Sequence, residues 1–60
     1  MAEVKVKRES GDWVRYPDAY FTIEEETLLV SEYEYTDFGV ETWTIAAWPK
    51  GTWLHAKLEA

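Results

Sequence analysis

The sequence predicts an all-β fold: a small antiparallel meander of five or six strands that forms a curled sheet or an SH3-like barrel. Short runs rich in Val, Ile, Thr, Tyr and Trp recur along the 60 residues. Turn residues separate these runs about every 8–12 residues, and no run has the apolar period of a helix. We therefore expect residues 1–60 to form a single domain of β-strands joined by short loops.

The first two strands are expected at Glu3–Arg8 and at residues 13–16. Glu3–Arg8 alternates, with Val4 and Val6 on one side and charged residues on the other, as in a half-buried strand. Outward lysines favour an edge position for this strand. The segment between the two strands, residues 9–12, is Glu-Ser-Gly-Asp, a composition typical of a turn.

The third and fourth strands are expected on either side of three consecutive glutamates. In residues 19–23, Phe21 and Ile23 are expected to point inward, because the alternate positions hold residues that tolerate water better. Residues 24–26, the three glutamates, are expected to form a tight turn. The alternative is the first turn of a helix, but the following TLLVSEYE run at residues 27–34 favours a strand.

The fourth strand has apolar residues on both sides. Leu28 and Val30 share a side with two glutamates, and the other side carries Leu29 and tyrosines. A bulge or bend near Ser31 would let such a strand change the surface that it covers. The Thr-Asp-Phe-Gly segment at residues 36–39 is expected to form the next turn.

The last third of the chain, residues 40–58, predicts a β-hairpin. Pro49 has the φ that a type I turn needs, and Gly51 can adopt the left-handed conformation that closes a three-residue loop. This turn pairs Trp48 with Thr52 and defines two faces. The face expected in the core carries Trp48, Ala46, Thr44, Val40, Leu54, Ala56 and Leu58. The opposite face carries Ala47, Ile45, Trp43, Trp53, His55, Lys57 and Glu41.

Trp43 and Trp53 lie near each other in this predicted hairpin. They either complete a second side of the core or form an aromatic surface that contacts a protein or a sugar. Both interpretations hold if the face is the seam of a homodimer.

The charge distribution indicates the class of partner. The net charge is −6, and between Tyr16 and Pro49 the chain has eight Asp and Glu residues and no Lys or Arg. Such a field disfavours direct binding of nucleic acid, which depends on cations that neutralise phosphates. A basic or polar protein partner fits better. The acidic residues either keep the protein solvated or imitate a phosphate track.

The residues of chemical catalysis are scarce in this chain. It has no cysteine and one histidine, His55, whose expected neighbours include no nucleophile. We therefore expect no enzymatic activity, no catalytic residues, no metal site and no cofactor. No apolar run approaches the roughly 20 residues of a membrane span, and the first residues lack a signal peptide's apolar segment. The expected location is the cytoplasm, with no membrane contact.

The segment AAWPKGTW at residues 46–53 resembles a group of uncharacterised small acidic β proteins of actinobacteria and their bacteriophages. In that group an apolar strand meets a Pro-Gly or Pro-x-Gly turn and a Trp. A Trp and an aromatic-rich strand lie near the N-terminus, as at residues 13–21 here. The resemblance implies an accessory phage-type protein that acts by binding, with no catalytic residues to transfer. Lys50 and the three glutamates depart from the group's pattern.

The expected function is a non-enzymatic protein-interaction module that binds a host protein through an aromatic and acidic face. The residues expected to form this face are Trp43, Trp53, Tyr33, Tyr35, Glu32, Glu34, Asp37 and Glu41. One alternative is an acidic nucleic-acid mimic that inhibits a basic DNA- or RNA-binding protein. A second is a glycan-binding module that stacks sugars on its tryptophans.

Overall fold

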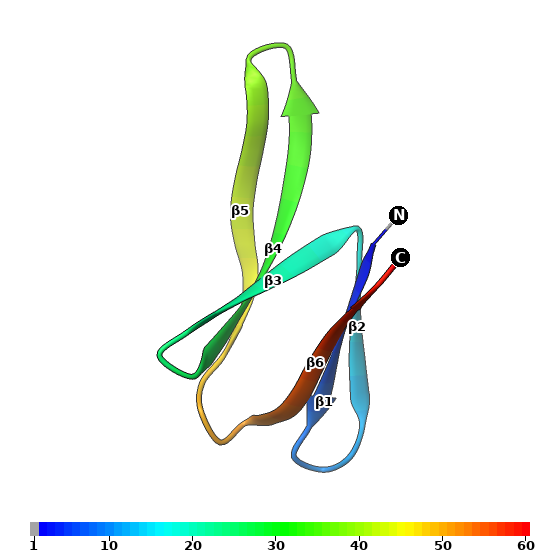
Figure 1. Cartoon of the computed structure of the whole chain (residues 1–60), viewed down its shortest axis with the longest axis vertical. Coiled ribbons are helices and arrows are strands. Elements are labelled where there is room, and N and C mark those ends of the chain that lie inside the picture. The colour runs from blue at the N-terminus through cyan, green and yellow to red at the C-terminus, as the bar shows by residue number, and fades with distance from the viewer. Residues whose placement is uncertain (1) are drawn as a thin grey trace.

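The computed structural model describes residues 2–60, and this part of the chain contains six β-strands and no helix. The strands are β1 (Glu3–Arg8), β2 (Trp13–Pro17), β3 (Ala19–Glu24), β4 (Thr27–Thr36), β5 (Gly39–Trp48) and β6 (Trp53–Glu59). They form a first sheet, ordered β2-β1-β6, and a second sheet, ordered β3-β4-β5 (Figure 1). The all-β prediction is confirmed. The two sheets are not closed, so the SH3-like barrel is not confirmed.

Strand β1 is the central strand of the first sheet. The edge position expected from the sequence is therefore wrong. It pairs antiparallel with β2, where Val6 lies opposite Val14, and with β6, where Val6 lies opposite Ala56. The alternation of valines and lysines in β1 shows that one face is covered and the other is solvated. A central strand of a sheet with one wet face has the same pattern as an edge strand.

The predicted hairpin over residues 40–58 is wrong. The turn itself forms, with Gly51 at φ 89° and the Thr52 N–H donating to the Pro49 carbonyl at 3.1 Å. However, β5 pairs with β4 and β6 pairs with β1, so this turn carries the chain from the second sheet to the first (Figure 1). A turn sets the local direction of the chain, but the pairing of the strands that follow depends on the faces they bury.

The three glutamates form a tight turn, as predicted. Glu24 pairs with Thr27, and Glu25 and Glu26 between them have φ values of 49° and 66°. Two consecutive left-handed residues are typical of a two-residue hairpin turn. Such a turn usually contains Asn-Gly, because most other side chains are strained in this conformation. Lys50 Nζ lies 2.8 Å from Glu26 Oε2 and reduces the repulsion in this acidic turn.

The predicted irregularity near Ser31 is confirmed. Val30 lies opposite Ala46, whereas Ser31 lies opposite Thr44, so Ile45 is an extra residue in β5. A bulge of this kind bends the strand and strengthens its twist. It lies where β4 and β5 leave the core.

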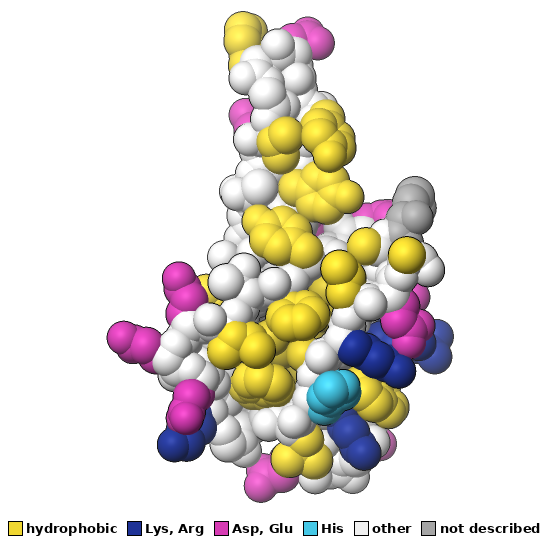
Figure 2. Space-filling model, viewed as in Figure 1, with side chains coloured by type: hydrophobic (Ala, Val, Ile, Leu, Met, Phe, Trp, Pro, Cys, Tyr) yellow, Lys and Arg dark blue, Asp and Glu magenta, His cyan; other side chains and the backbone are white. Residues whose placement is uncertain are grey.

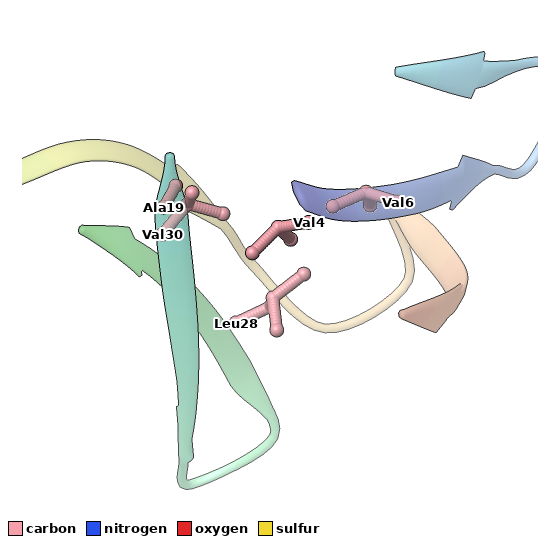
Figure 3. Close-up of a cluster of buried hydrophobic side chains, with 5 residues drawn as sticks. All are labelled: Val4, Val6, Ala19, Leu28 and Val30. Carbon is pink, nitrogen blue, oxygen red and sulfur yellow. The ribbon is translucent and has the colours of Figure 1, made fainter. Parts of the chain in front are cut away.

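The core lies between the inner faces of the two sheets. Its fully buried side chains are Val4, Val6, Ala19, Leu28 and Val30. Val4 of β1 and Leu28 of β4 point toward each other across the core (Figure 3). Packed around them are the half-buried Tyr16, Phe21, Ala46, Trp48, Trp53 and Ala56. Trp48 Nε1 donates a hydrogen bond to the Tyr16 hydroxyl at 3.2 Å, and this bond links the two sheets.

The predicted core face is correct only in part. Trp48, Ala46 and Ala56 pack against the core, but Thr44, Val40, Leu54 and Leu58 are exposed. The error follows from the hairpin that does not form. In β3, Phe21 packs against the core as predicted, whereas Ile23, near the end of the strand, is exposed.

Trp48→Ala is expected to lower the free energy of unfolding by about 3–5 kcal/mol, because it removes a large ring from a small core. The matched control is Trp43→Ala, an exposed tryptophan whose loss should cost at most about 1 kcal/mol. Denaturant unfolding followed by circular dichroism measures both. Equal losses would show that Trp48 does not support the core.

Candidate functional site: a projecting arm and a basic face

Strands β4 and β5 extend beyond the second sheet as a two-stranded ribbon, which we call the arm and define as residues 33–42. The pairing of β3 with β4 ends at Ala19 and Glu32, whereas β4 and β5 remain paired as far as Thr36 and Gly39. The arm projects from the body in Figure 1 and contributes to a molecule that measures 41 × 23 × 13 Å. Two-stranded ribbons are marginally stable in water, so the arm gains little from its own pairing.

The tip of the arm is the turn predicted at residues 36–39. Thr36 Oγ1 accepts a hydrogen bond from the Phe38 N–H at 3.2 Å and donates one to the Gly39 carbonyl at 3.3 Å. Gly39 has a φ of 129°, which a residue with a side chain rarely adopts. The Phe38 ring is fully exposed at this tip. Because the ring packs against nothing in residues 2–60, it is an apolar group that the described fold leaves available for contact.

One face of the arm carries tyrosines. The Tyr33 and Tyr35 rings meet edge to face with centroids 5.6 Å apart, and Tyr20 of β3 lies 6.1 Å from Tyr33. Tyr35 is 77% exposed, and the exposed Val40 lies opposite it in β5. Figure 2 shows apolar side chains along the arm and onto the body. These mutual contacts hold the rings in place while leaving them accessible.

The other face of the arm is acidic. Residues opposite each other in a β ladder share a face, so Glu34 and Glu41 lie side by side there, with Glu32 opposite Trp43 at its base. Trp43 Nε1 donates to Glu32 Oε1 at 3.2 Å. Within residues 2–60, neither Glu34 nor Glu41 forms an ion pair. Directly opposed like charges destabilise a ribbon.

The backbone of the arm is also accessible. Strand β5 is an edge of the second sheet, so the backbone groups on its outer side have no strand partner in the described chain. Its sequence, GVETWTIAAW, contains no Lys or Pro, the residues that commonly protect sheet edges. The part of this edge that belongs to the arm, before the bulge at Ile45, is therefore open to an added strand.

The residues predicted for one binding face gather on the arm with one exception, but the tyrosines and the glutamates lie on its opposite faces, so they do not form the single face that was expected. Tyr33, Tyr35, Glu34, Asp37 and Glu41 lie on it, and Glu32 and Trp43 lie at its base. The exception is Trp53, which lies opposite Arg8 in the first sheet and packs against the core. The pairing that would bring Trp43 and Trp53 together does not form, so the predicted aromatic surface of these two residues is wrong.

Sequence reasoning also missed Phe38, which it treated only as part of a turn. A bulky apolar residue in a short solvated turn was the available signal.

The outer face of the first sheet is basic, a feature that the net charge conceals. We call it the basic face, and it carries Lys5, Lys7, Arg15, Lys57, Trp13 and His55. The Trp13 ring is the centre of this group: its centroid lies 5.1 Å from Lys57 Nζ, 6.0 Å from Lys7 Nζ and 6.1 Å from the His55 ring. Figure 2 shows the histidine flanked by Lys or Arg side chains. Cations near an indole ring gain about 0.5–1 kcal/mol at exposed sites.

His55 lies in this group, which contains Lys57 but none of the other neighbours expected from the predicted hairpin. The pairings of β1 with β2 and β6 bring it beside Trp13 and Lys7. The alternation of β1 was the signal for Lys5 and Lys7, but only the tertiary pairing adds Lys57 and Arg15.

Ion pairs neutralise part of the basic face. Lys5 Nζ lies 2.9 Å and Lys57 Nζ 3.1 Å from the carboxylate oxygens of Glu59, and Arg15 Nε lies 3.8 Å from Glu3 Oε1. Hydrogen bonds from Lys5 and then Lys57 lower the pKa of Glu59 below its ordinary value. An open hollow of about 260 Å³ lies among Lys5, Trp13, Arg15 and Lys57.

A second open hollow lies beside the turn at residues 9–12 and the end of β5. It measures about 330 Å³ and is lined by Arg8, Glu9, Ser10, Trp48 and Thr52. Among residues 2–60, no three His, Asp or Glu side chains gather as a metal-binding group. The arm and the basic face are therefore the surfaces whose chemistry the fold leaves unexplained.

Glu41→Gln is expected to stabilise the protein by about 0.2–1 kcal/mol, because it removes the like-charge contact with Glu34. The gain should shrink as salt rises. Glu9→Gln, in the exposed turn after β1, is the control and should change the free energy of unfolding little. A Glu41→Gln protein that is no more stable than the parent at low salt would contradict the repulsion.

The Glu59 carboxyl should titrate below its ordinary pKa in the folded protein and return toward it in the Lys5→Gln/Lys57→Gln variant. Because the folded pKa is lower than the unfolded one, these ion pairs stabilise the fold above the unfolded pKa. Their contribution is lost as pH falls through the lowered pKa. Carboxyl chemical shifts in an NMR titration measure both midpoints, and identical midpoints in parent and variant would refute the lysine contacts.

Residues 2–60 contain no helix long and apolar enough to cross a membrane. Comparisons of the chain with protein-family models, with curated proteins and with solved structures find no match.

Proposed function

We propose that this protein is a non-enzymatic interaction module and that its arm binds a partner protein with basic and apolar groups. The observation that carries the proposal is the arm itself. A 60-residue chain has few large apolar residues to spare for its core, yet Tyr35 and Phe38 stand in solvent on a ribbon that supports no other element. Such an arrangement costs stability and is useful only if another molecule covers it.

The two faces of the arm indicate the chemistry of the partner. Tyrosine gives a large contact area with few rotatable bonds, and the edge contact between Tyr33 and Tyr35 fixes the rings before binding. On the opposite face, Glu34 and Glu41 have no ion-pair partner among residues 2–60. A partner that supplies Lys or Arg would relieve their repulsion and gain charge-assisted hydrogen bonds.

The open edge of β5 offers a third mode of contact. An extended strand from the partner can pair with the backbone of β5 and place alternate side chains on the two faces of the arm. Backbone pairing would supply affinity, while the tyrosine and acidic faces would supply specificity. On the resemblance of residues 46–53, we place this binding in an accessory role of phage type that acts on a host protein.

The test is capture of partners from a bacterial lysate by the tagged protein, in parallel at low and moderate ionic strength. The parent should retain a basic partner at moderate salt, because apolar contacts are screened little. The Tyr35→Ala/Phe38→Ala variant should capture at least about tenfold less of this partner than the parent, since these are the most exposed rings of the arm.

The matched control is Ile23→Ala/Leu54→Ala, which also removes two exposed apolar side chains but leaves the arm intact. Equal capture by both double variants would overturn the arm as the binding surface. Capture of a nucleic-acid-binding protein at low salt alone would favour the acidic mimic. Quenching of tryptophan fluorescence by oligosaccharides would favour the glycan module.

A further inference from the structure

We infer that this chain associates head to tail with copies of itself, the arm of one copy lying on the basic face of the next. The inference rests on the proposed function, because it uses the arm as a binding surface, and it adds the identity of one occupant. Its grounds are the charges of the two surfaces, their places in the fold and their similar dimensions.

The charge complementarity is marked for so small a protein. Four of the six Lys and Arg residues of the chain lie on the basic face, while the stretch between Tyr16 and Pro49, which contains the whole arm, has none. Lys7 forms no ion pair within residues 2–60 and lies between the Trp13 and His55 side chains of the neighbouring strands. The basic face thus retains free positive charge in a chain whose net charge is −6.

The arm carries negative charge that has no cation to neutralise it within residues 2–60. Glu34 and Glu41 repel each other, and Asp37 adds a third carboxylate at the tip without an ion-pair partner in residues 2–60. Lysines of a second copy would neutralise this cluster. Each surface also has a partly exposed tryptophan, Trp43 at the base of the arm and Trp13 on the basic face, at 43% and 42% exposure. Burial of these rings would add apolar contact to the charge pairing.

The contact has to form between molecules. The arm extends from the second sheet away from the first sheet, whose outer face carries the cations (Figure 1). A strand of five residues is about 17 Å long, so the arm matches the length of β1 and its neighbours. Strands lie about 4.8 Å apart, and a two-stranded ribbon therefore fits across a three-stranded face.

Because two different surfaces meet, the association is heterologous. Such contacts build open chains or closed rings, the smallest of which is a pair of copies that exchange arms. Nucleic acid is the competing occupant of the basic face, since an exposed Trp among cations can also stack a base. The carboxylates of Glu3 and Glu59 lie together at one end of the face, where they would repel a long polyanion that crosses it, whereas the short arm can reach Lys7 at the other end.

The test uses two variants that each disable one surface without reversing its charge. Glu34→Gln/Glu41→Gln neutralises the arm, and Lys7→Gln/Lys57→Gln neutralises the basic face. Analytical ultracentrifugation should show concentration-dependent growth of the parent at low salt and less growth at moderate salt. Each variant alone should need at least about tenfold higher concentration for the same growth.

The mixture of the two variants gives the decisive result. Only one productive junction remains, between the intact arm of one variant and the intact basic face of the other, so the mixture should form a 1:1 pair and nothing larger. A chain carrying Glu34→Lys/Glu41→Lys together with Lys7→Glu/Lys57→Glu should assemble again, because both surfaces are reversed.

Three outcomes would overturn the inference. The parent could stay monomeric at all concentrations, or the basic-face variant could assemble as the parent does, which would indicate arm-to-arm contact. Single-stranded DNA could quench Trp13 fluorescence in a monomeric parent but not in the basic-face variant, which would assign the face to nucleic acid. A monomeric parent that still captures a partner through its arm would separate failure of self-association from failure of the proposed function.

Discussion

The structure depends on the packing of two small sheets through their inner faces. Val4 and Val6 of β1 meet Leu28 and Val30 of the second sheet, and the hydrogen bond from Trp48 to Tyr16 ties the sheets together at one side. With no disulfide and few fully buried side chains, this contact supplies most of the apolar burial. It also determines which strands pair, because β6 completes the first sheet beside β1 instead of returning along β5.

The arm is the part of β4 and β5 that extends beyond this core. Only the part of β4 before Ser31 contributes to the core, and the bulge opposite Ser31 is where the ribbon departs from it. Beyond that point the chain carries exposed rings, a pair of opposed glutamates and an unpaired edge, none of which stabilises a monomer. Local features that oppose stability are expected at functional sites, where another molecule compensates for them.

The fold places the cations of both ends of the chain on one sheet and the acidic arm on the other. Alternation along β1 puts Lys5 and Lys7 on the outer face while the valines face the core, and the neighbouring strands add Arg15 and Lys57 to that face. The acidic residues of the arm lie on the other sheet. A chain with a net charge of −6 thereby presents one basic surface and one acidic surface, and its association with other molecules depends on which surface they meet.

The sequence by itself determined the strand content, the turns at residues 9–12, 24–26 and 36–39, the irregularity near Ser31 and the acidic character of residues 17–48. These features depend on residues close together in the chain, through alternation, backbone preferences and local charge. Only the tertiary structure decided that β6 pairs with β1, that Trp53 leaves the predicted binding face and that Trp13 and His55 share a basic one. Strand pairing between distant segments is set by the apolar faces that the whole fold must bury, and a turn such as Pro49-Lys50-Gly51 contains no information about that choice.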